Sequence, residues 1–222
     1  MNQNRVTGVV VALALLCPLD SIAAQADIVN SGFEAISLPD PEGWSDTAPG
    51  WTVEGVAGSY NPSELSMPGA GGVVPEGSNM AFVNAGSLFQ TLSTRLTENS
   101  VYTLNVDVVK RLQPEFQSAS YLIELLAGET VIAEDANSLS PASGTFETST
   151  LFYNALSGDL LAGNFLGIRL SGFGAQTGFD NVSLDASSAP PLVATPIPAA
   201  FPLFGSALGL LGFAGWKRKK NA

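Results

Sequence analysis

Apolar side chains recur at every second position in a series of short runs between residues 28 and 185. The clearest run is residues 101–108, in which apolar and polar side chains alternate without interruption. A period of two places the two sets on opposite faces of a β-strand, one buried and one in water. No window of about 12 residues in this region sustains the apolar period of an amphipathic helix. The region is therefore predicted to be all-β.

Turn residues separate nine or ten such runs. The expected strands are residues 28–35, 51–56, 80–83, 88–92, 101–108, 121–126, 130–133, 146–152, 166–170 and 179–184. Strands of this length and spacing predict a two-sheet sandwich over residues 27–188. Residues 40–49 and 60–77 are long connections rich in Gly and Pro, and a binding surface is expected on such loops.

Two residue types that serve many enzymes are scarce in this chain. Cys17 is the only cysteine, and histidine is absent. Histidine-based triads, cysteine nucleophiles and Cys/His zinc sites are thereby excluded from the domain. A hydrolase that uses a carboxylate pair stays open as a less favoured alternative. Its candidate residues are Glu42, Asp46, Glu54, Glu64 and Glu76. The domain is expected not to be an enzyme.

The domain carries a strong negative charge. Residues 27–195 contain nineteen acidic and four basic side chains, which gives a net charge of about −15. Such a surface repels phosphate backbones, so a nucleic-acid partner is excluded. Divalent cations would be attracted to it.

Both ends of the chain carry the features of targeting segments. Residues 1–26 combine Arg5, an apolar run over residues 6–16 and small residues before the expected cleavage site, as in a secretory signal peptide. Residues 197–216 are uncharged and long enough to span a bilayer as a helix. The basic residues 217–222 that follow are expected on the cytoplasmic side.

The segment before the apolar span resembles a known sorting signal. Residues 195–200 read Thr-Pro-Ile-Pro-Ala-Ala, and residues 189–196 form a linker rich in Pro, Ser and Ala. Together with the span and the basic end, this resembles the PEP-CTERM class in its Val-Pro-Leu-Pro-Ala variant. The resemblance implies that an exosortase recognises Pro196, Ile197, Pro198 and Ala199. The protein is then exported through the inner membrane, held by its C-terminal helix and released to the cell surface or matrix. A permanent membrane anchor is the alternative.

Four short motifs of the domain follow one another in a recognisable order. They are residues 30–34, 49–51, 89–92 and 179–184. This order resembles the jelly-roll sandwich of galactose-binding-like and carbohydrate-binding modules. The resemblance implies a structural Ca²⁺ with Glu34 and Asp180 as side-chain ligands. In the alternative, both carboxylates only accept hydrogen bonds from the joined terminal strands.

Aromatic side chains on loops are the candidate binding residues. Trp44, Tyr60 and Phe116 lie on expected loops, and such rings can contact the C–H faces of sugars. The sequence thus predicts a non-catalytic surface or matrix protein that binds extracellular polysaccharide. A structural matrix or adhesion protein without a specific glycan ligand is the competing hypothesis.

Overall fold

The computed structural model describes residues 24–39, 42–66, 73–111 and 120–189, and every regular element in these segments is a β-strand. The strands are β1 (Ala24–Gln25), β2 (Trp44–Ser45), β3 (Thr52–Tyr60), β4 (Met80–Arg95), β5 (Ser100–Lys110), β6 (Ser120–Ala127), β7 (Thr130–Asp135), β8 (Phe146–Ala155), β9 (Phe165–Phe173) and β10 (Thr177–Ser188). The predicted all-β jelly-roll sandwich is confirmed. The signal helix was predicted within residues 1–26, of which only 24–26 are described, and the membrane-spanning helix was predicted for residues 197–216, which lie outside the described segments.

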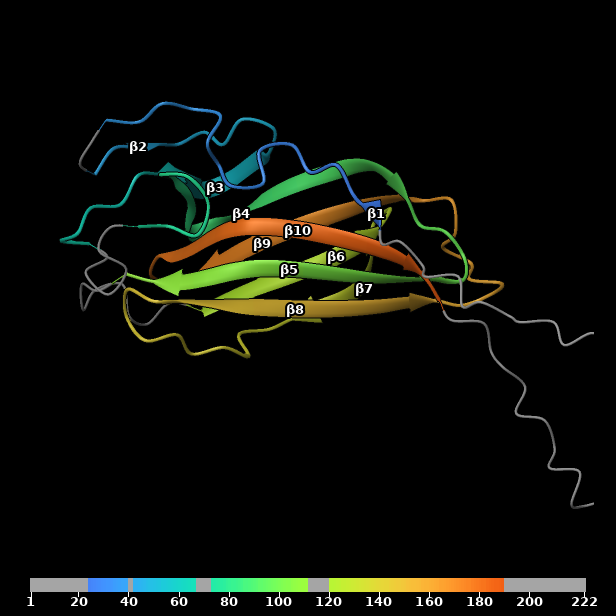
Figure 1. Cartoon of the computed structure of the whole chain (residues 1–222). Helices are drawn as coiled ribbons and strands as arrows, with labels where there is room; N and C mark the ends of the chain where they lie inside the picture. Colours follow the sequence, from blue (N-terminus) through green and yellow to red (C-terminus); the bar gives the residue numbers. More distant parts are fainter. Residues whose placement is uncertain (1–23, 40–41, 67–72, 112–119, 190–222) are drawn as a thin grey trace, which may run out of the picture. The chain divides into compact units, whose positions relative to one another are not determined.

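The strands form two layers that share one long strand. In one layer the order is β8-β5-β10-β4, and in the other it is β7-β6-β9-β4, with all neighbours antiparallel. Figure 1 shows β5, β8 and β10 in front of β6, β7 and β9. β3 pairs with β4 along its length, and the two-residue β2 pairs with the end of β3.

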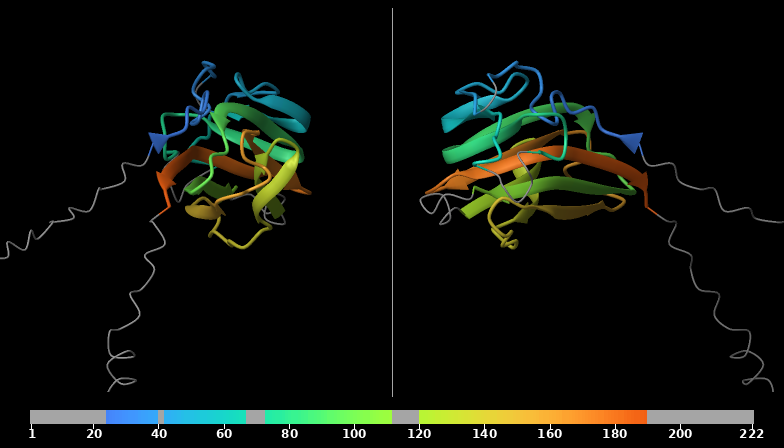
Figure 2. Two further views of the ribbon diagram at one scale, coloured as in Figure 1. Left: turned by 90° about the vertical axis from the view of Figure 1, so that its right-hand side faces the viewer. Right: turned by 60° about the vertical axis from the view of Figure 1, so that its left-hand side comes forward.

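The 16-residue strand β4 crosses between the layers. Residues 81–83 pair with β10, and pairing with β9 begins at Gly86. Figure 2 shows β3 and β4 side by side in both views, along one margin of the sandwich. Two separate strands, 80–83 and 88–92, were predicted here. The polar and small residues 84–87 interrupt the alternation in the sequence, yet they continue the backbone pairing while the strand changes layers.

The core lies between the layers and is formed by the apolar positions that the alternation predicted. Tyr102, Leu104, Val106 and Val108 of β5 are all buried, as are Leu166, Ile168 and Leu170 of β9. Trp51 is buried against Phe33 with ring centroids 5.5 Å apart. These contacts remove the rings and aliphatic chains from water, which is the dominant stabilising term for a domain without a disulfide.

One predicted strand is absent from the described fold. Residues 28–35 form successive turns, in which Asn30 and Phe33 adopt positive φ angles of 56° and 61°. The side chain of Asn30 fixes these turns, since its Oδ1 accepts a hydrogen bond from the Ala35 N–H at 2.8 Å. Asparagine tolerates this backbone region and bonds to its own loop, so local hydrogen bonding replaces strand pairing here.

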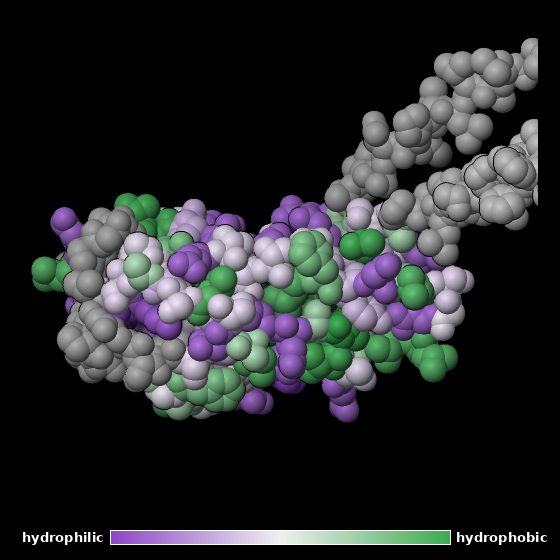
Figure 3. Space-filling model, turned by 90° about the horizontal axis from the view of Figure 1, so that it is seen from below, coloured by the Kyte–Doolittle hydropathy of each residue, from purple (hydrophilic) through white to green (hydrophobic). Residues whose placement is uncertain are grey.

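The edge strands β7 and β8 border a hollow of about 830 Å³. Its carboxylate Asp135 is already bound, because Tyr121 donates to it at 2.9 Å and Ser149 donates to the same carboxylate. Burial raises the pKa of Tyr121 to about 12, which keeps its hydroxyl protonated. On the face seen in Figure 3, apolar groups gather in small areas between polar ones. Within the described segments no helix is long and apolar enough to cross a bilayer.

Candidate functional site

A cavity of about 510 Å³ lies where β2, β3 and β4 meet the ends of β5 and β10. Its walls are mainly apolar and aromatic, and a few polar side chains project into it. The described residues that line it are Trp44, Asp46, Gly55, Val56, Ala57, Tyr60, Phe82, Asn84, Arg111 and Gln176. A largely apolar pocket with a few convergent polar groups is the usual form of a small-molecule site.

The outer wall of the cavity is the short strand β2. Trp44 pairs with Tyr60, and its ring lies edge-on to Phe82 with centroids 6.4 Å apart. β2 can approach β3 this closely because residue 58 is glycine. A Cβ on Gly58 would lie 2.0 Å from the carbonyl oxygen of Ser45. Gly58 therefore permits the wall that carries Trp44.

A second apolar cluster forms beneath the cavity. Met80, Phe82 and Val109 pack with Tyr60 and Val74 on the side of the sheet away from the main core. Tyr60 and Phe82 belong both to this cluster and to the cavity lining. The cavity thus rests on a packed floor, which holds its aromatic rings in fixed positions.

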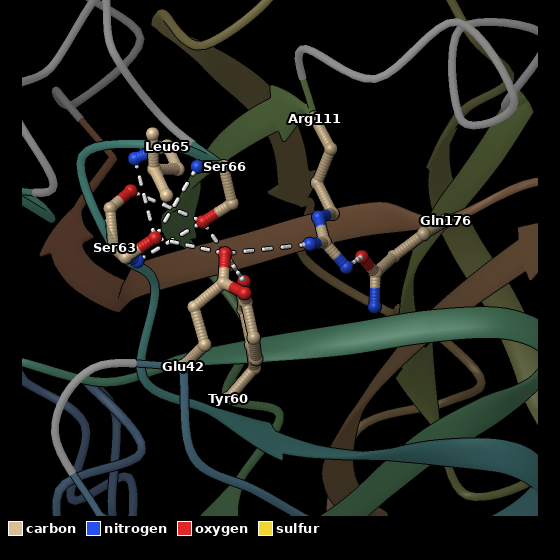
Figure 4. A network of polar contacts seen from close by, with 7 residues as sticks. All are labelled: Glu42, Tyr60, Ser63, Leu65, Ser66, Arg111 and Gln176. Carbon is tan, nitrogen blue, oxygen red and sulfur yellow. Dashed lines mark hydrogen bonds and ion pairs between the residues drawn. The ribbon is translucent and has the colours of Figure 1, made fainter.

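A network of hydrogen bonds fixes the loop beside the cavity (Figure 4). The Tyr60 hydroxyl donates to Ser66 Oγ at 2.9 Å, and Ser63 Oγ donates to Glu42 Oε1 at 2.8 Å. The bond from Ser63 is the main cause that lowers the pKa of Glu42, so this carboxylate is ionised. Burial raises the pKa of Tyr60, so its hydroxyl stays protonated. The network orients Tyr60 as a wall of the cavity.

Arg111 provides the positive charge of the cavity. Its Nη1 donates to Gln176 Oε1 at 2.9 Å, and its guanidinium lies 4.8 Å from the centre of the Tyr60 ring. Its Nη2 is 3.9 Å from Glu42 Oε1 (Figure 4). Arg111 directly follows β5, and Gln176 directly precedes β10. Because β5 and β10 are neighbouring strands, the sheet places the two residues side by side.

Glu34 and Asp180 meet at a different place, on the loop before β4. Glu34 Oε1 accepts hydrogen bonds from the N–H groups of Ser78 and Asn79, at 2.7 and 2.5 Å. Asp180 Oδ2 accepts one from the Glu76 N–H at 3.0 Å. The other oxygen, Asp180 Oδ1, is buried without a hydrogen-bond partner. The two carboxylates bind one loop rather than each other.

The ionisation of Asp180 is strongly disfavoured in this environment. Its side chain is fully buried, and burial is the main cause that raises its pKa to about 8, with added repulsion from Glu76 and Asp107. A hard cation accepts oxygen ligands of this kind. Among the described residues, however, no three acidic, histidine or cysteine side chains are grouped closely enough to hold a metal. A cation here would need backbone carbonyl or water oxygens to complete its shell.

The comparisons with known proteins decide the family. The sequence model of the HpiC1-like family, described as HpiC1 cyclase, matches residues 24–185. The chain belongs to the HpiC1-like cyclase family. No curated protein matches it in sequence.

Solved structures of cyclases resemble this chain along its whole domain. The Stig cyclase Fisc from Fischerella sp. TAU, in complex with (3Z)-3-(1-methyl-2-pyrrolidinylidene)-3H-indole, is 30% identical with a TM-score of 0.68. The match covers 76% of this chain and 100% of the Fischerella chain. A cyclase from Fischerella sp. TAU in complex with 4-(1H-indol-3-yl)butan-2-one is also 30% identical, with a TM-score of 0.66 and the same coverage.

Membership of this family corrects several expectations from the sequence. The assignment to PEP-CTERM surface proteins is wrong, and so is the expectation of a non-enzymatic matrix protein, because the family and its solved relatives are cyclases. The expected partners, an exosortase and a polysaccharide, are wrong for the same reason. The error has a chemical cause. Absence of histidine and cysteine excludes certain hydrolases, but ring closure can proceed with carboxyl and hydroxyl groups in an apolar cavity.

The structure brings some of the predicted site residues together. Trp44 and Tyr60 line the same cavity, as does Asp46. Glu54 lines a separate groove with Arg169, and Glu76 lies next to Asp180, so the five acidic candidates form no common cleft. Phe116 and the motif Pro196, Ile197, Pro198 and Ala199 lie outside the described residues and stay predictions.

Seven lining residues of the cavity were not singled out from the sequence, and the four of them with an aromatic or polar side chain are Phe82, Asn84, Arg111 and Gln176. Two of them carry a weak signal. Asn84 is a lone amide within the otherwise apolar run of residues 80–86, and Arg111 is one of only four basic residues in the domain. Neither signal reveals that the two residues share a cavity, because that depends on the pairing of β3, β4, β5 and β10.

Proposed function

We propose that this chain is a cyclase that closes a ring on an indole-bearing substrate held in the cavity between Trp44, Tyr60 and Phe82. The observation that carries the proposal is the aromatic, mainly apolar cavity of about 510 Å³ in a domain that belongs to a cyclase family. The two Fischerella cyclases have indolic molecules bound. Flat aromatic rings pack edge-on or offset against one another. Because the Trp44 and Phe82 rings are perpendicular, a substrate ring can pack offset against one of them and edge-on against the other.

Proton exchange is the chemistry that we assign to Asp46. A ring closure without change of mass needs one proton delivered to the substrate and one removed, so no oxidant or second substrate is required. Of the described residues that line the cavity, Asp46 alone carries a carboxyl group. It can give a proton to an alkene carbon and take one back after the new carbon–carbon bond has formed. Arg111 and Gln176 supply donors for an electronegative substituent.

Replacing Trp44 is expected to weaken ligand binding. In the Trp44→Ala variant the cavity loses one aromatic wall, so the affinity for 4-(1H-indol-3-yl)butan-2-one should fall up to tenfold, as loss of one aromatic contact of about 0.5–1.5 kcal/mol predicts. Titration calorimetry on the purified full chain measures this. Phe152→Ala is the matched control, because Phe152 on β8 has the same exposed fraction of 66% as Trp44 but lies outside the cavity. Equal affinity of the wild type and Trp44→Ala would place the ligand elsewhere.

Replacing Asp46 is expected to separate catalysis from binding. The Asp46→Asn variant keeps the shape of the side chain but cannot exchange a proton, so turnover should fall about 100-fold or more. The test substrates are 3-alkenylindoles. Liquid chromatography with mass spectrometry detects turnover as a new product that has the same mass as the substrate. Binding of 4-(1H-indol-3-yl)butan-2-one should be retained. Retained turnover in Asp46→Asn would assign the proton transfer to another group.

We also propose that Glu34 and Asp180 hold a structural Ca²⁺. The support is the buried, unpartnered Oδ1 of Asp180 and the acidic groups around it. The ion would neutralise these carboxylates and join the turns of residues 30–35 to β10. Its role is to stabilise the fold, since neither residue lines the cavity.

Export is a further proposal, and it rests on the sequence. Residues 1–26 have the charge pattern and apolar length of a secretory signal peptide. The domain predicted between residues 27 and 188 would then act outside the inner membrane, with residues 189–222 as a linker, an apolar span and a basic end.

A further inference from the structure

Asn84 is a lining residue of the cavity whose amide oxygen has no hydrogen-bond partner. Its Oδ1 is shielded from water, and no residue donates a hydrogen bond to it. Buried polar atoms in folded proteins are nearly always paired, so an unpaired one calls for an explanation. The unpaired buried atoms of Ser59 and Asp180, also among the described residues, lie outside the cavity.

The position of Asn84 in the sheet explains why its amide is unpaired. It lies between the last pair of β4 with β10, Val83 with Thr177, and the first pair of β4 with β9, Gly86 with Gly172. The register of β3 also shifts here, between Val56 and Ala57. Asn84 therefore has no direct cross-strand neighbour, and its side chain faces the cavity where β4 leaves one layer for the other.

We propose that Asn84 Oδ1 accepts a hydrogen bond from the ring N–H of the substrate and thereby selects an indole over other bicyclic rings. This inference rests on the proposed function. The aromatic walls bind any flat ring, whereas an acceptor in an apolar cavity favours a ligand with a donor. The terminal torsion of an asparagine amide is broad, so a modest rotation turns Oδ1 towards a bound ring. Phe82, two residues earlier on the same face of β4, places that ring beside the amide.

The test compares two isosteric ligands on the full chain. One is 4-(1H-indol-3-yl)butan-2-one, and the other is its 1-benzofuran analogue, in which a ring oxygen replaces the N–H. The wild type is expected to bind the indole about tenfold more tightly, which corresponds to one ordinary hydrogen bond. Asn84→Leu should bind both ligands equally, and its Tm should equal or exceed that of the wild type, because an unpaired buried acceptor has been removed.

Two further variants separate this role from a structural one. Asn84→Asp carries only acceptor oxygens, so it should keep the preference for the indole. If it loses the preference, the amide acts as a donor and the proposal is overturned. Ser59→Ala removes an unpaired buried atom outside the cavity and should keep the wild-type preference. Equal binding of the two ligands to the wild type, or an unchanged preference in Asn84→Leu, overturns the inference while the proposed function stands. No binding of either ligand to the wild type overturns both.

Discussion

The Asp180→Asn variant is expected to melt at a higher temperature than the wild type in calcium-free buffer at pH 8. Asp180 is fully buried, its Oδ1 has no partner, and the acidic Glu76 and Asp107 lie nearby. Ionising such a carboxyl is costly, whereas asparagine has nearly the same shape and no charge. The difference in the free energy of unfolding should reach several kcal/mol, since the folded-state pKa is raised from 3.8 to about 8 and each pKa unit corresponds to about 1.4 kcal/mol.

The pH dependence of this effect has a defined sign. Between pH 4 and pH 8 the folded protein retains the proton of Asp180 while the unfolded chain releases it, because the two pKa values are about 8 and 3.8. The unfolded state then binds fewer protons, so the stability of the wild type falls as the pH rises through this window. Below pH 4 the contribution of protonated Asp180 to the stability of the fold is fully present. In Asp180→Asn this contribution to the decline should be absent.

Calcium is expected to narrow the difference in Tm between the wild type and Asp180→Asn at pH 8. An ion that binds only the folded state at a hundred times its Kd adds about 2.7 kcal/mol to the free energy of unfolding. Differential scanning calorimetry with and without a chelator should therefore show a calcium-dependent rise in Tm for the wild type and none for Asp180→Asn. Asp159→Asn removes a half-buried carboxylate on another loop, one that already accepts hydrogen bonds from Tyr153 and Leu161, and serves as the control. If calcium does not change the Tm of the wild type, Glu34 and Asp180 act only as hydrogen-bond acceptors.

The Gly58→Ala variant is expected to lose most of its affinity for 4-(1H-indol-3-yl)butan-2-one although residue 58 does not line the cavity. The added Cβ would lie 2.0 Å from the carbonyl oxygen of Ser45 and 2.9 Å from the Cα of Asp46. Backbone atoms cannot yield as the end of a side chain can, so β2 must move away from β3. Because β2 carries Trp44 and is followed directly by Asp46, both of which line the cavity, affinity should fall about tenfold or more, with about 1–3 kcal/mol lost from the free energy of unfolding.

A matched substitution controls for the added methyl group. Gly167 on β9 is also a strand glycine without a positive φ angle, but a Cβ there would meet the Phe89 ring at 3.1 Å and a backbone atom, the carbonyl oxygen of Gln90, no nearer than 3.5 Å. Gly167→Ala should retain wild-type affinity, measured by titration calorimetry beside Gly58→Ala. Unchanged affinity in Gly58→Ala, with a lowered Tm, would mean that the position of β2 does not control the cavity.

The fold class was predictable because apolar residues on the buried face of a strand alternate with polar residues on its exposed face. The alternation in residues 101–108 and 166–170 identified the buried faces of β5 and β9, and both faces form the core. The turns of residues 28–35 and the continuous β4 were not predictable in this way. They depend on the hydrogen bond of the Asn30 side chain and on the change of pairing partner along β4. Neither feature produces a periodic pattern in the sequence.

The functional site was predictable only in part. The sequence by itself determined that the domain is all-β, acidic and without histidine, and that Trp44 and Tyr60 are candidate binding residues. Only the tertiary structure decided that these rings share a cavity with Phe82, Asn84, Arg111 and Gln176. The physical reason is that the cavity residues come from five segments up to 132 positions apart, Trp44 to Gln176, and strand pairing alone brings them together. Local periodicity reports which side of a strand is buried, whereas a binding site depends on which strands become neighbours.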